Sequence, residues 1–377
     1  MRSNCDTIIL GAGIVGTACA MECAQAGMKV LVVERAIVGG GATAAGMGHI
    51  VVMDDSPAQL ELTRYSQQLW HALAPRLPAE TEYQTIGTIW IAADDVELQE
   101  VERKRALCEA SEIHARVLDP RQLLHEEPHL RPGLAGGLLV PSDAVLYPPV
   151  AAAFLLQEAV NAGATLVRQT VVHAGQGKVR LANGEMLSAP RLVNALGAGA
   201  ASLTPDLPIR ARKGHLAITD RAPGFVRHQL VELGYLRSAG TATADSVAFN
   251  VQPRKTSQLL IGSSRQFNSE DNAIDHEILQ RMMQQTLRYM PAIGRLSVLR
   301  TWTGFRAATP DKLPLIGPHP GDPTLYLATG HEGLGITTAL ATGKLLRHVF
   351  TGSGSEIPVE PYLPARVLQH SAKTRHG

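Results

Sequence analysis

The chain has 377 residues, of which 45% are hydrophobic and 18% are charged. This length suits two domains or one large domain with an insertion, and the composition excludes bulk disorder. The 35 lysines and arginines nearly balance the 34 aspartates and glutamates, so no overall basic field indicates a nucleic-acid partner. The four cysteines are too few and too scattered for the disulfide framework of a small secreted domain.

The N-terminus lacks the pattern of a secretory leader. Its start is short and polar, and Gly11, Gly13 and Gly16 interrupt the apolar run that follows. No segment approaches the ~20 consecutive apolar residues that a membrane-spanning helix needs. We therefore expect a cytoplasmic protein, for which a partner could still provide peripheral attachment to the inner membrane.

The first predicted elements form a strand, turn, helix and strand. Thr7–Leu10 is a short apolar strand, and Gly11–Gly16 is a glycine-rich turn that opens a helix over Ile14–Gln25. Gly27 is typical of a helix end, and Lys29–Val33 follows as a second buried strand. This order predicts a βαβ unit and therefore a parallel sheet.

The glycine-rich turn has the spacing of a dinucleotide-binding fingerprint. Gly11 permits the tight turn, Gly13 lets the backbone approach a pyrophosphate, and Gly16 lets the helix lie close to the strand. The N–H groups at the helix start then face the pyrophosphate. Glu34, at the end of the second strand, offers a carboxylate to ribose hydroxyls and disfavours NADP. FAD and NAD both remain, and the second small-residue loop, Gly39–Gly46, favours FAD because the longer cofactor needs a further backbone-lined channel.

The elements that follow alternate between helices and strands. We expect helices over 56–73, 96–110 and 150–162, strands over 88–92, 165–168 and 192–195, and a hairpin turn at Asn183-Gly184. Six prolines between 120 and 149 predict a region made mostly of connections.

Residues 211–300 differ in character from the rest of the chain. The alternating stretches His215–Thr219, Ser246–Val251 and Gln258–Ile261 favour antiparallel strands, and Ile274–Tyr289 favours a helix. From Trp302 onward small residues return, with a strand expected over 325–328 and a helix over 336–350.

These elements predict an α/β protein: a Rossmann-like FAD-binding domain with an inserted α+β domain built on an antiparallel sheet. The FAD-binding domain is expected to be discontinuous, over 1–80, 141–210 and 301–377. The substrate-binding domain is expected over 81–140 and 211–300.

Several stretches together resemble the D-amino-acid-oxidase-type family of FAD-dependent oxidoreductases, which includes glycine oxidase and sarcosine oxidase. The matching segments follow the family order over nearly the whole chain: 11–16 with Glu34-Arg35, 41–47, 192–199, 302–311, 313–317 and 325–346. The resemblance implies a FAD-binding domain of the glutathione-reductase type and FAD as the cofactor.

Two segments, 45–55 and 330–338, resemble more particularly the catalytic subunits of bacterial multi-subunit amino-acid dehydrogenases. D-hydroxyproline dehydrogenase β subunits are the most similar in style, and opine oxidase B subunits and hydrogen cyanide synthase C subunits are relatives. The resemblance implies oxidation of the Cα–N bond of cis-4-hydroxy-D-proline, or a related proline, to the cyclic imine. It also implies a hetero-oligomer whose partner subunits carry the electrons onward. An O₂-using glycine or sarcosine oxidase, an opine oxidase subunit and a non-catalytic flavin subunit are the alternatives.

The resemblance also assigns substrate contacts. Arg306 is implied to clamp the substrate carboxylate over the flavin, since a planar guanidinium holds a carboxylate through two parallel hydrogen bonds. A structural salt-bridge arginine is the alternative. Met47, His49, His331 and Glu332 are the other expected contacts. A structural role is the alternative for both histidines, and Glu332 also suits an acid near the start of the following helix. No side chain is expected as a catalytic acid or base, because flavin N5 accepts the hydride.

The cofactor contacts are implied on the glycine-rich turn, the second loop and the start of the last helix. FAD is expected at Gly11, Ala12, Gly13, Ile14, Val15, Gly16, Glu34, Arg35, Gly41, Ala42, Thr43, Ala45, Gly46, Met47, Val172, Gly330, Gly333, Leu334, Gly335, Ile336 and Thr337. Some family members attach FAD through a cysteine shortly before a Thr-Pro-Asp element. Gly304 stands at that place here, so noncovalent FAD is expected.

Two departures separate the chain from glycine oxidase. Asn250 stands where glycine oxidase has a substrate tyrosine, and Gly333 stands where it has a second arginine. A different substrate pocket is therefore expected. No metal site is expected either, because Cys19 and Cys23 share one helix face without a further pair of ligands at suitable spacing. The chain has no Gly-x-Ser-x-Gly elbow, which argues against a hydrolase.

Overall fold

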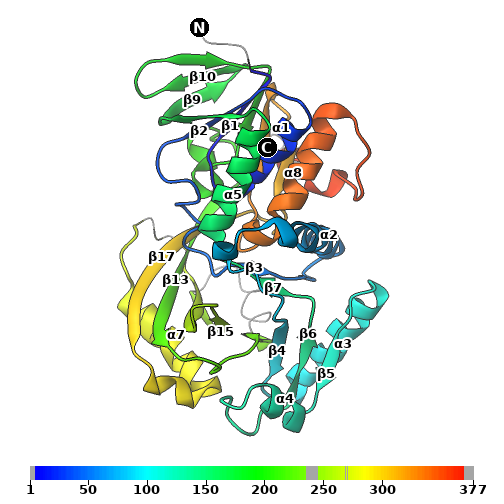
Figure 1. Ribbon diagram of the computed structural model, residues 1–377, viewed down its shortest axis with the longest axis vertical. Coiled ribbons are helices and arrows are strands. Elements are labelled where there is room, and N and C mark those ends of the chain that lie inside the picture. Colours follow the sequence, from blue (N-terminus) through cyan, green and yellow to red (C-terminus); the bar gives the residue numbers. More distant parts are fainter. Residues whose placement is uncertain (1–4, 235–244, 268, 270, 369–377) are drawn as a thin grey trace, which may run out of the picture.

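The computed structural model describes residues 5–234, 245–267, 269 and 271–368. The protein has two lobes, each built on its own large sheet (Figure 1). The upper lobe in Figure 1 holds the glycine-rich turn, and the lower lobe holds the long antiparallel strands.

The upper lobe is built on a six-stranded sheet in the order β18-β19-β12-β1-β2-β8. All neighbours are parallel except the edge strand β18, which runs antiparallel to β19. Residues from the beginning, the middle and the end of the chain therefore meet in one sheet. The strands are β1 Thr7–Leu10, β2 Val30–Glu34, β8 Thr165–Arg168, β12 Arg191–Asn194, β18 Leu315–His319 and β19 Asp322–Thr329.

Strand β1 is apolar throughout because other elements pack on both faces of this sheet. Ile9 packs into the cluster formed by the helices, whereas Ile8 and Leu10 pack toward a small three-stranded sheet. The hairpin turn predicted at Asn183-Gly184 lies between two strands of that small sheet and is confirmed. The helices are α1 Ile14–Gln25, α5 Pro148–Asn161 and α8 Gly335–Thr351, and the small sheet holds β9 Val171–Gly175, β10 Lys178–Leu181 and β11 Met186–Ser188.

Small residues let α1 and α8 approach closely. A Cβ added at Gly343 would lie 2.8 Å from the carbonyl oxygen of Ala18. Cys19 and Cys23 are buried here with free thiols, in agreement with a core role. Helix α2 (Pro57–Leu73) also contacts α8.

The lower lobe is built on an eight-stranded sheet in the order β17-β13-β16-β15-β14-β4-β6-β5. Only the β14–β4 pair is parallel. Helix α7 (His276–Tyr289) covers one face, where its Met282 packs with Phe249, Val251 and Ile261. The strands are β4 Thr88–Ala92, β5 Arg116–Leu118, β6 Gly136–Val140, β13 Arg210–Arg221, β14 Gln229–Glu232, β15 Ser246–Pro253, β16 Gln258–Arg265 and β17 Val298–Ala308.

Two expectations from the sequence need correction. The proline-rich region contains α4 (Pro120–Glu126) and β6, because Pro120 occupies the first turn of a helix, where its missing N–H has no cost. Residues 301–308 were expected with the FAD-binding domain, yet β17 pairs with β13 along most of its length and so belongs to the large sheet. The other domain limits remain a proposal.

A short ribbon lies between the two lobes. Strand β3 (His49–Ile50) pairs antiparallel with β7 (Ala144–Val145), and Figure 1 places both between the sheets. His49 is thereby fixed at the junction of the lobes. Within the described ranges, no helix has the length and apolar character needed to span a membrane.

Candidate active site at the junction of the two sheets

The glycine-rich turn packs as tightly as a dinucleotide site requires. Gly11 has a φ of +101°, and a Cβ there would lie 2.9 Å from the carbonyl oxygen of Ala195. A Cβ at Gly16 would overlap the carbonyl oxygen of Gly11. At Gly13 the nearest atom to an added Cβ is the hydroxyl of Thr43 at 3.5 Å, so the backbone stays open to a phosphate.

Glu34 is fixed at the end of β2 by two backbone N–H groups. Ala12 and Ala36 each donate to one of its carboxylate oxygens at 2.8 Å. Each oxygen keeps a lone pair for a ribose hydroxyl, as the fingerprint predicts. Arg35, the next residue, is exposed.

Three segments from different parts of the chain meet beside this turn. The first N–H of α1 donates to the Thr43 hydroxyl at 3.0 Å. A Cβ at Gly46 would lie 2.7 Å from Ile336 at the start of α8, and one at Gly335 would lie 3.8 Å from Val15 on α1. The second loop and the starts of α1 and α8 therefore line one continuous path of small residues, which fits a long cofactor.

The remaining expected cofactor contacts lie at the edges of this path. Gly41 and Ala42 are exposed, and a Cβ at Gly41 would meet no atom within 4 Å. Val172 is 46% exposed on β9. Gly330, with a φ of +80°, and Leu334, the N-cap of α8, form the turn that leads into the helix.

Arg306 on β17 lies across the face of the large sheet next to α8. Its Nη1 donates to the carbonyl oxygen of Ser264 on β16 at 2.9 Å. A Cβ at Gly214 on β13 would overlap the guanidinium, so glycine at this position is what lets the side chain lie flat. An added Cβ at Gly333 would lie 3.8 Å from the Arg306 side chain. A cation is thus held between the sheet and the turn before α8.

His49 lies near Arg306 and is neutral. Its carbonyl oxygen accepts from the Thr337 hydroxyl at 2.9 Å, which ties β3 to the first turn of α8. Burial, with a contribution from the Arg306 cation, lowers the pKa of His49 to about 3. Its Nε2 is buried and has no hydrogen-bond partner among the described residues. The neutral imidazole can donate or accept one hydrogen bond at this atom, but it does not take up a second proton at neutral pH.

Met47 belongs to an apolar cluster on the same sheet face. It packs with Leu216 and Leu260, and the partly buried Trp302 lies against them. A Cβ at Gly262 would lie 3.1 Å from the Met47 sulfur. The surface beside Arg306 therefore includes an apolar patch, which excludes water from a ligand that packs on it.

The side chains of His331 and Glu332 have partners within the protein, and their contact with substrate stays a prediction. His331 Nε2 pairs with the Thr342 hydroxyl at 2.9 Å, and burial lowers the pKa of His331 to about 3. Glu332 forms an ion pair with Arg212, whose guanidinium lies 4.7 Å from the ring centroid of Phe267. Both residues stabilise the turn before α8 from within the protein.

Two polar residues on β15 lie close to this group, and sequence reasoning gave neither a role. Asn250 entered only as a departure from glycine oxidase, and Gln252 was not considered. Gln252 Nε2 donates to the carbonyl oxygen of Met47 at 2.8 Å. The available signal was two polar residues at alternate positions between the apolar residues of one strand.

Gly304 leaves no room for a larger residue. A Cβ at this position would overlap the Cβ of Ala45 in the second loop. A cysteine for covalent attachment of a flavin would therefore require the loop to shift.

The similarity of this chain to known proteins decides its family. The chain matches the family described as DAO, FAD dependent oxidoreductase, over residues 6–349. It belongs to the DAO family of FAD-dependent oxidoreductases. The predicted fold class, the oxidoreductase class and FAD as the cofactor are confirmed.

Relatives of this DAO-family chain span almost its full length. Glycine oxidase of Pseudomonas aeruginosa is 28% identical and covers 95% of this chain and 98% of its own. Hydrogen cyanide synthase subunit HcnC of the same organism is 25% identical, covering 97% of both chains. Among solved structures, L-proline dehydrogenase from P. horikoshii is 22% identical with a TM-score of 0.88, covering 98% of this chain and 99% of its own.

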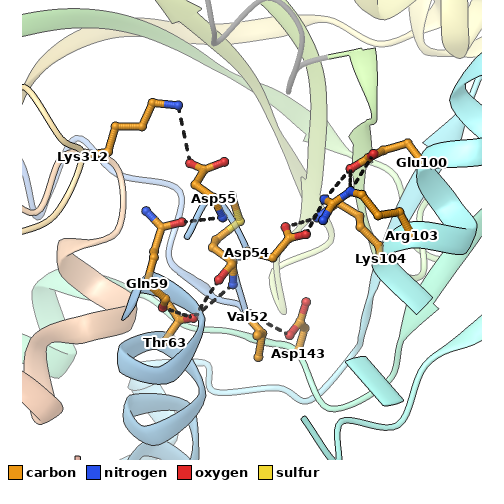
Figure 2. A network of polar contacts seen from close by, with 11 residues as sticks. Val52, Asp54, Asp55, Gln59, Thr63, Glu100, Arg103, Lys104, Asp143 and Lys312 are labelled. Atoms are coloured by element: carbon orange, nitrogen blue, oxygen red, sulfur yellow. Dashed lines mark hydrogen bonds and ion pairs between the residues drawn. The ribbon is translucent and has the colours of Figure 1, made fainter. Parts of the chain in front are cut away.

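In this DAO-family chain, the segment after β3 is held by a network of polar side chains (Figure 2). The Val52 N–H donates to Asp143 Oδ1 at 3.3 Å, and Gln67 Nε2 donates to the same oxygen at 2.8 Å. The Met53 N–H donates to the Thr63 hydroxyl at 3.1 Å. Burial raises the pKa of Asp143 to about 7.

The same segment carries a buried ion pair. Lys104 on α3 (Asp95–Ala110) pairs with Asp54 and lies 4.5 Å from the ring centroid of Trp90. Arg103 also pairs with Asp54, at 2.6 Å. Burial opposes ionisation of Asp54, but the two cations outweigh it and hold the pKa of Asp54 below its usual value. These contacts fix the segment that begins with His49.

Proposed function

We propose that this chain is an FAD-dependent amino-acid dehydrogenase. It oxidises the Cα–N bond of cis-4-hydroxy-D-proline, or a related proline, to the cyclic imine. The observation that carries the proposal is the Arg306 guanidinium, which lies flat on the large sheet between Ser264 and the turn before α8. A carboxylate bound to it lies beside the start of α8 and the cofactor path.

The side chains around Arg306 orient the substrate and exclude water. The guanidinium holds the carboxylate in one orientation, so that the Cα–H points toward the cofactor. The cluster of Met47, Leu216 and Leu260 removes water from the substrate ring. Desolvation lowers the pKa of the substrate amine and favours its neutral form, whose lone pair assists loss of hydride. His49, neutral at working pH, supplies a hydrogen bond rather than a base.

Bound FAD supplies the redox chemistry by accepting a hydride at N5. The fingerprint turn and Glu34 hold its adenosine end, and the second loop with the start of α8 lines the rest of its length. The positive end of the α8 dipole favours negative charge in its vicinity. FAD is bound noncovalently, because Gly304 and Ala45 leave no space for a linking cysteine.

Electrons leave through partner subunits. One relative is named as a subunit of hydrogen cyanide synthase, and one structural neighbour is a dehydrogenase of proline. The chain has four cysteines in all, and Cys19 and Cys23 are buried in the helix layer, so any relay beyond FAD must lie on another polypeptide or in a soluble dye. We propose a hetero-oligomer of this kind, with an artificial dye as a substitute acceptor.

A glycine or sarcosine oxidase is the second candidate, because P. aeruginosa glycine oxidase is 28% identical over nearly the full length. Anaerobic mixing of the purified holoprotein with cis-4-hydroxy-D-proline, D-proline, L-proline, sarcosine and glycine separates the two. We expect the flavin absorbance to bleach with a proline, and a dye to be reduced much faster than O₂. Bleaching by glycine alone, with one hydrogen peroxide formed per turnover, would establish the second candidate instead.

Noncovalent binding is tested on the same preparation. After acid precipitation and washing, we expect the yellow colour in the supernatant. Colour retained by the pellet would show a covalent link.

A further inference from the structure

Two buried amide oxygens on β15 have no hydrogen-bond partner among the described residues. They are Asn250 Oδ1 and Gln252 Oε1, on side chains that are 9% and 2% exposed. Buried acceptors are costly to leave unpaired, and most buried polar groups in proteins have a partner. Two such atoms two residues apart call for an explanation.

Both side chains point to the face of the large sheet that carries Arg306. Side chains alternate along a strand, and Phe249 and Val251 face the helix α7 side. Asn250 and Gln252 therefore face the opposite side. The hydrogen bond from Gln252 Nε2 to the Met47 carbonyl confirms this direction. It also fixes the amide, so that Oε1 is the atom left to accept.

Asn250 lies near the end of the Arg306 side chain, although the two residues start from different cross-strand rows of the sheet. The strands β17, β13, β16 and β15 are consecutive, spaced by about 4.8 Å. Arg306 starts on β17 and reaches Ser264 on β16, and Asn250 pairs in register with Gly262, two residues before Ser264. The Met47 sulfur lies over Gly262. The amide therefore lies one strand beyond the guanidinium and two residues further along β16, and Leu216 packs over the same glycine as the Met47 sulfur.

We propose that Asn250, supported by Gln252, determines specificity by accepting a hydrogen bond from a hydroxyl group on the substrate ring. The inference rests on the proposed function for the identity of the ring. The substrate class is then a hydroxylated cyclic amino acid: its carboxylate pairs with Arg306, its ring packs against Met47, and its hydroxyl donates to the Asn250 amide. Glycine and sarcosine have no group that reaches this acceptor.

The test compares two unreactive carboxylates that differ by one hydroxyl. Cyclopentanecarboxylate and cis-3-hydroxycyclopentanecarboxylate lack an amine, so neither reduces the flavin. Their dissociation constants are measured on the holoprotein from the perturbation of flavin absorbance. We expect the wild type to bind the hydroxylated compound about 10- to 100-fold more tightly, because a substrate lacking the donor leaves a buried acceptor unpaired.

Two variants assign that preference to the amide. Asn250→Leu removes the acceptor at similar volume, and we expect the preference to fall to about onefold while cyclopentanecarboxylate binds as before. Asn250→Asp keeps an acceptor and should retain the preference. Asn161→Leu, at the exposed end of α5, is the matched control and should bind both compounds like the wild type.

The outcomes separate this inference from the proposed function. If the wild type binds both carboxylates equally, the inference is overturned, whatever the enzyme oxidises. Equal weakening of both compounds in Asn250→Leu would also overturn it, because that result indicates a structural role. If the hydroxyl preference holds but no proline bleaches the flavin, the acceptor site stands and the proposed function falls.

Discussion

Two buried polar regions of this protein differ in whether the chain completes their hydrogen bonding. Around Asp54 and Asp143, carboxylates are matched by Lys104, Arg103, Gln67 and backbone N–H groups. On the sheet face around Arg306, Asn250 Oδ1, Gln252 Oε1 and His49 Nε2 have no partner among the described residues. The second region has the signature of a site whose missing partners come with the ligand.

The first region also has two buried oxygens with no hydrogen-bond partner among the described residues, Thr88 Oγ1 and Asp143 Oδ2. A carboxyl with a pKa raised to about 7 by burial carries a proton through much of the physiological range, which removes the cost of a bare anionic oxygen. Its other oxygen still accepts from Val52 and Gln67. The region is therefore consistent with a structural role.

The largest expected effect comes from removing the charge of Arg306, in the region where buried polar atoms lack partners. Arg306→Ala should retain FAD and lower kcat/KM by about 100- to 1,000-fold or more, because leaving a bound carboxylate without its cation costs ~3–5 kcal/mol. Arg306→Lys should recover only part of the loss, since an ammonium cannot make the paired planar contact. Steady-state rates with a dye acceptor measure this. Unchanged kcat/KM in Arg306→Ala would refute the clamp.

Removing a charge from the region around Asp54 should instead lower the free energy of unfolding. Lys104 is 4% exposed, so Lys104→Met leaves Asp54 buried with only Arg103 as partner and should lower the free energy of unfolding by about 3 kcal/mol. Urea unfolding of the holoprotein measures this. Arg103→Met, at a half-exposed position, is the matched control and should cost less than about 1 kcal/mol. A fall in kcat/KM at unchanged stability would show that Lys104 and Asp54 belong to the active site and have no structural role.

The raised pKa of Asp143 predicts a pH dependence of stability. In the unfolded chain this carboxyl titrates near 4, whereas in the folded chain its pKa is about 7. Its contribution is fully present below about pH 4 and is lost as pH rises through about 7, at roughly 1 kcal/mol per pH unit. Asp143→Asn should remove this slope while keeping the acceptor for Val52. Identical slopes in both proteins between pH 5 and 7 would show that Asp143 does not bind the proton.

The smallest expected effect has the opposite sign. Asn250→Leu should raise the free energy of unfolding of the ligand-free protein by about 1 kcal/mol, because it replaces an unpaired buried amide with an apolar side chain of similar volume. Chemical denaturation without substrate measures this. Destabilisation by more than 1 kcal/mol would mean that the amide is already paired inside the protein, like those around Asp143.

Local patterns in the sequence predicted well the elements that line the cofactor path. The first strand, turn, helix and Glu34 are fixed by glycine spacing and by buried strands, which are properties of neighbouring residues. The start of α8 was predicted at 336 and lies at Gly335, after a small-residue turn. Cofactor chemistry was therefore predictable because its binding elements are contiguous.

The sheet face around Arg306 depends on strand pairing and contacts between distant residues, which one sequence does not reveal. The role proposed for Asn250 rests on its register with Gly262, and the hydrogen bond of His331 depends on Thr342 on the next helix. The sequence did not predict strand β17. One reason is that Val298 and Leu299 are exposed at its start, so apolar and polar residues along the strand do not alternate with burial. In each case tertiary contacts decide the role of the residue.

The order of strands in the two large sheets determines when each lobe can form as the chain leaves the ribosome. The upper sheet needs β19, which ends at Thr329, and the lower sheet needs β17, which ends at Ala308. Through most of translation, therefore, β12 and β13 each lack a neighbour and expose an open edge. Helix α8 arrives last and supplies one wall of the cofactor path, so flavin loading follows synthesis. Truncation before α8 should yield an aggregating chain rather than a smaller flavoprotein.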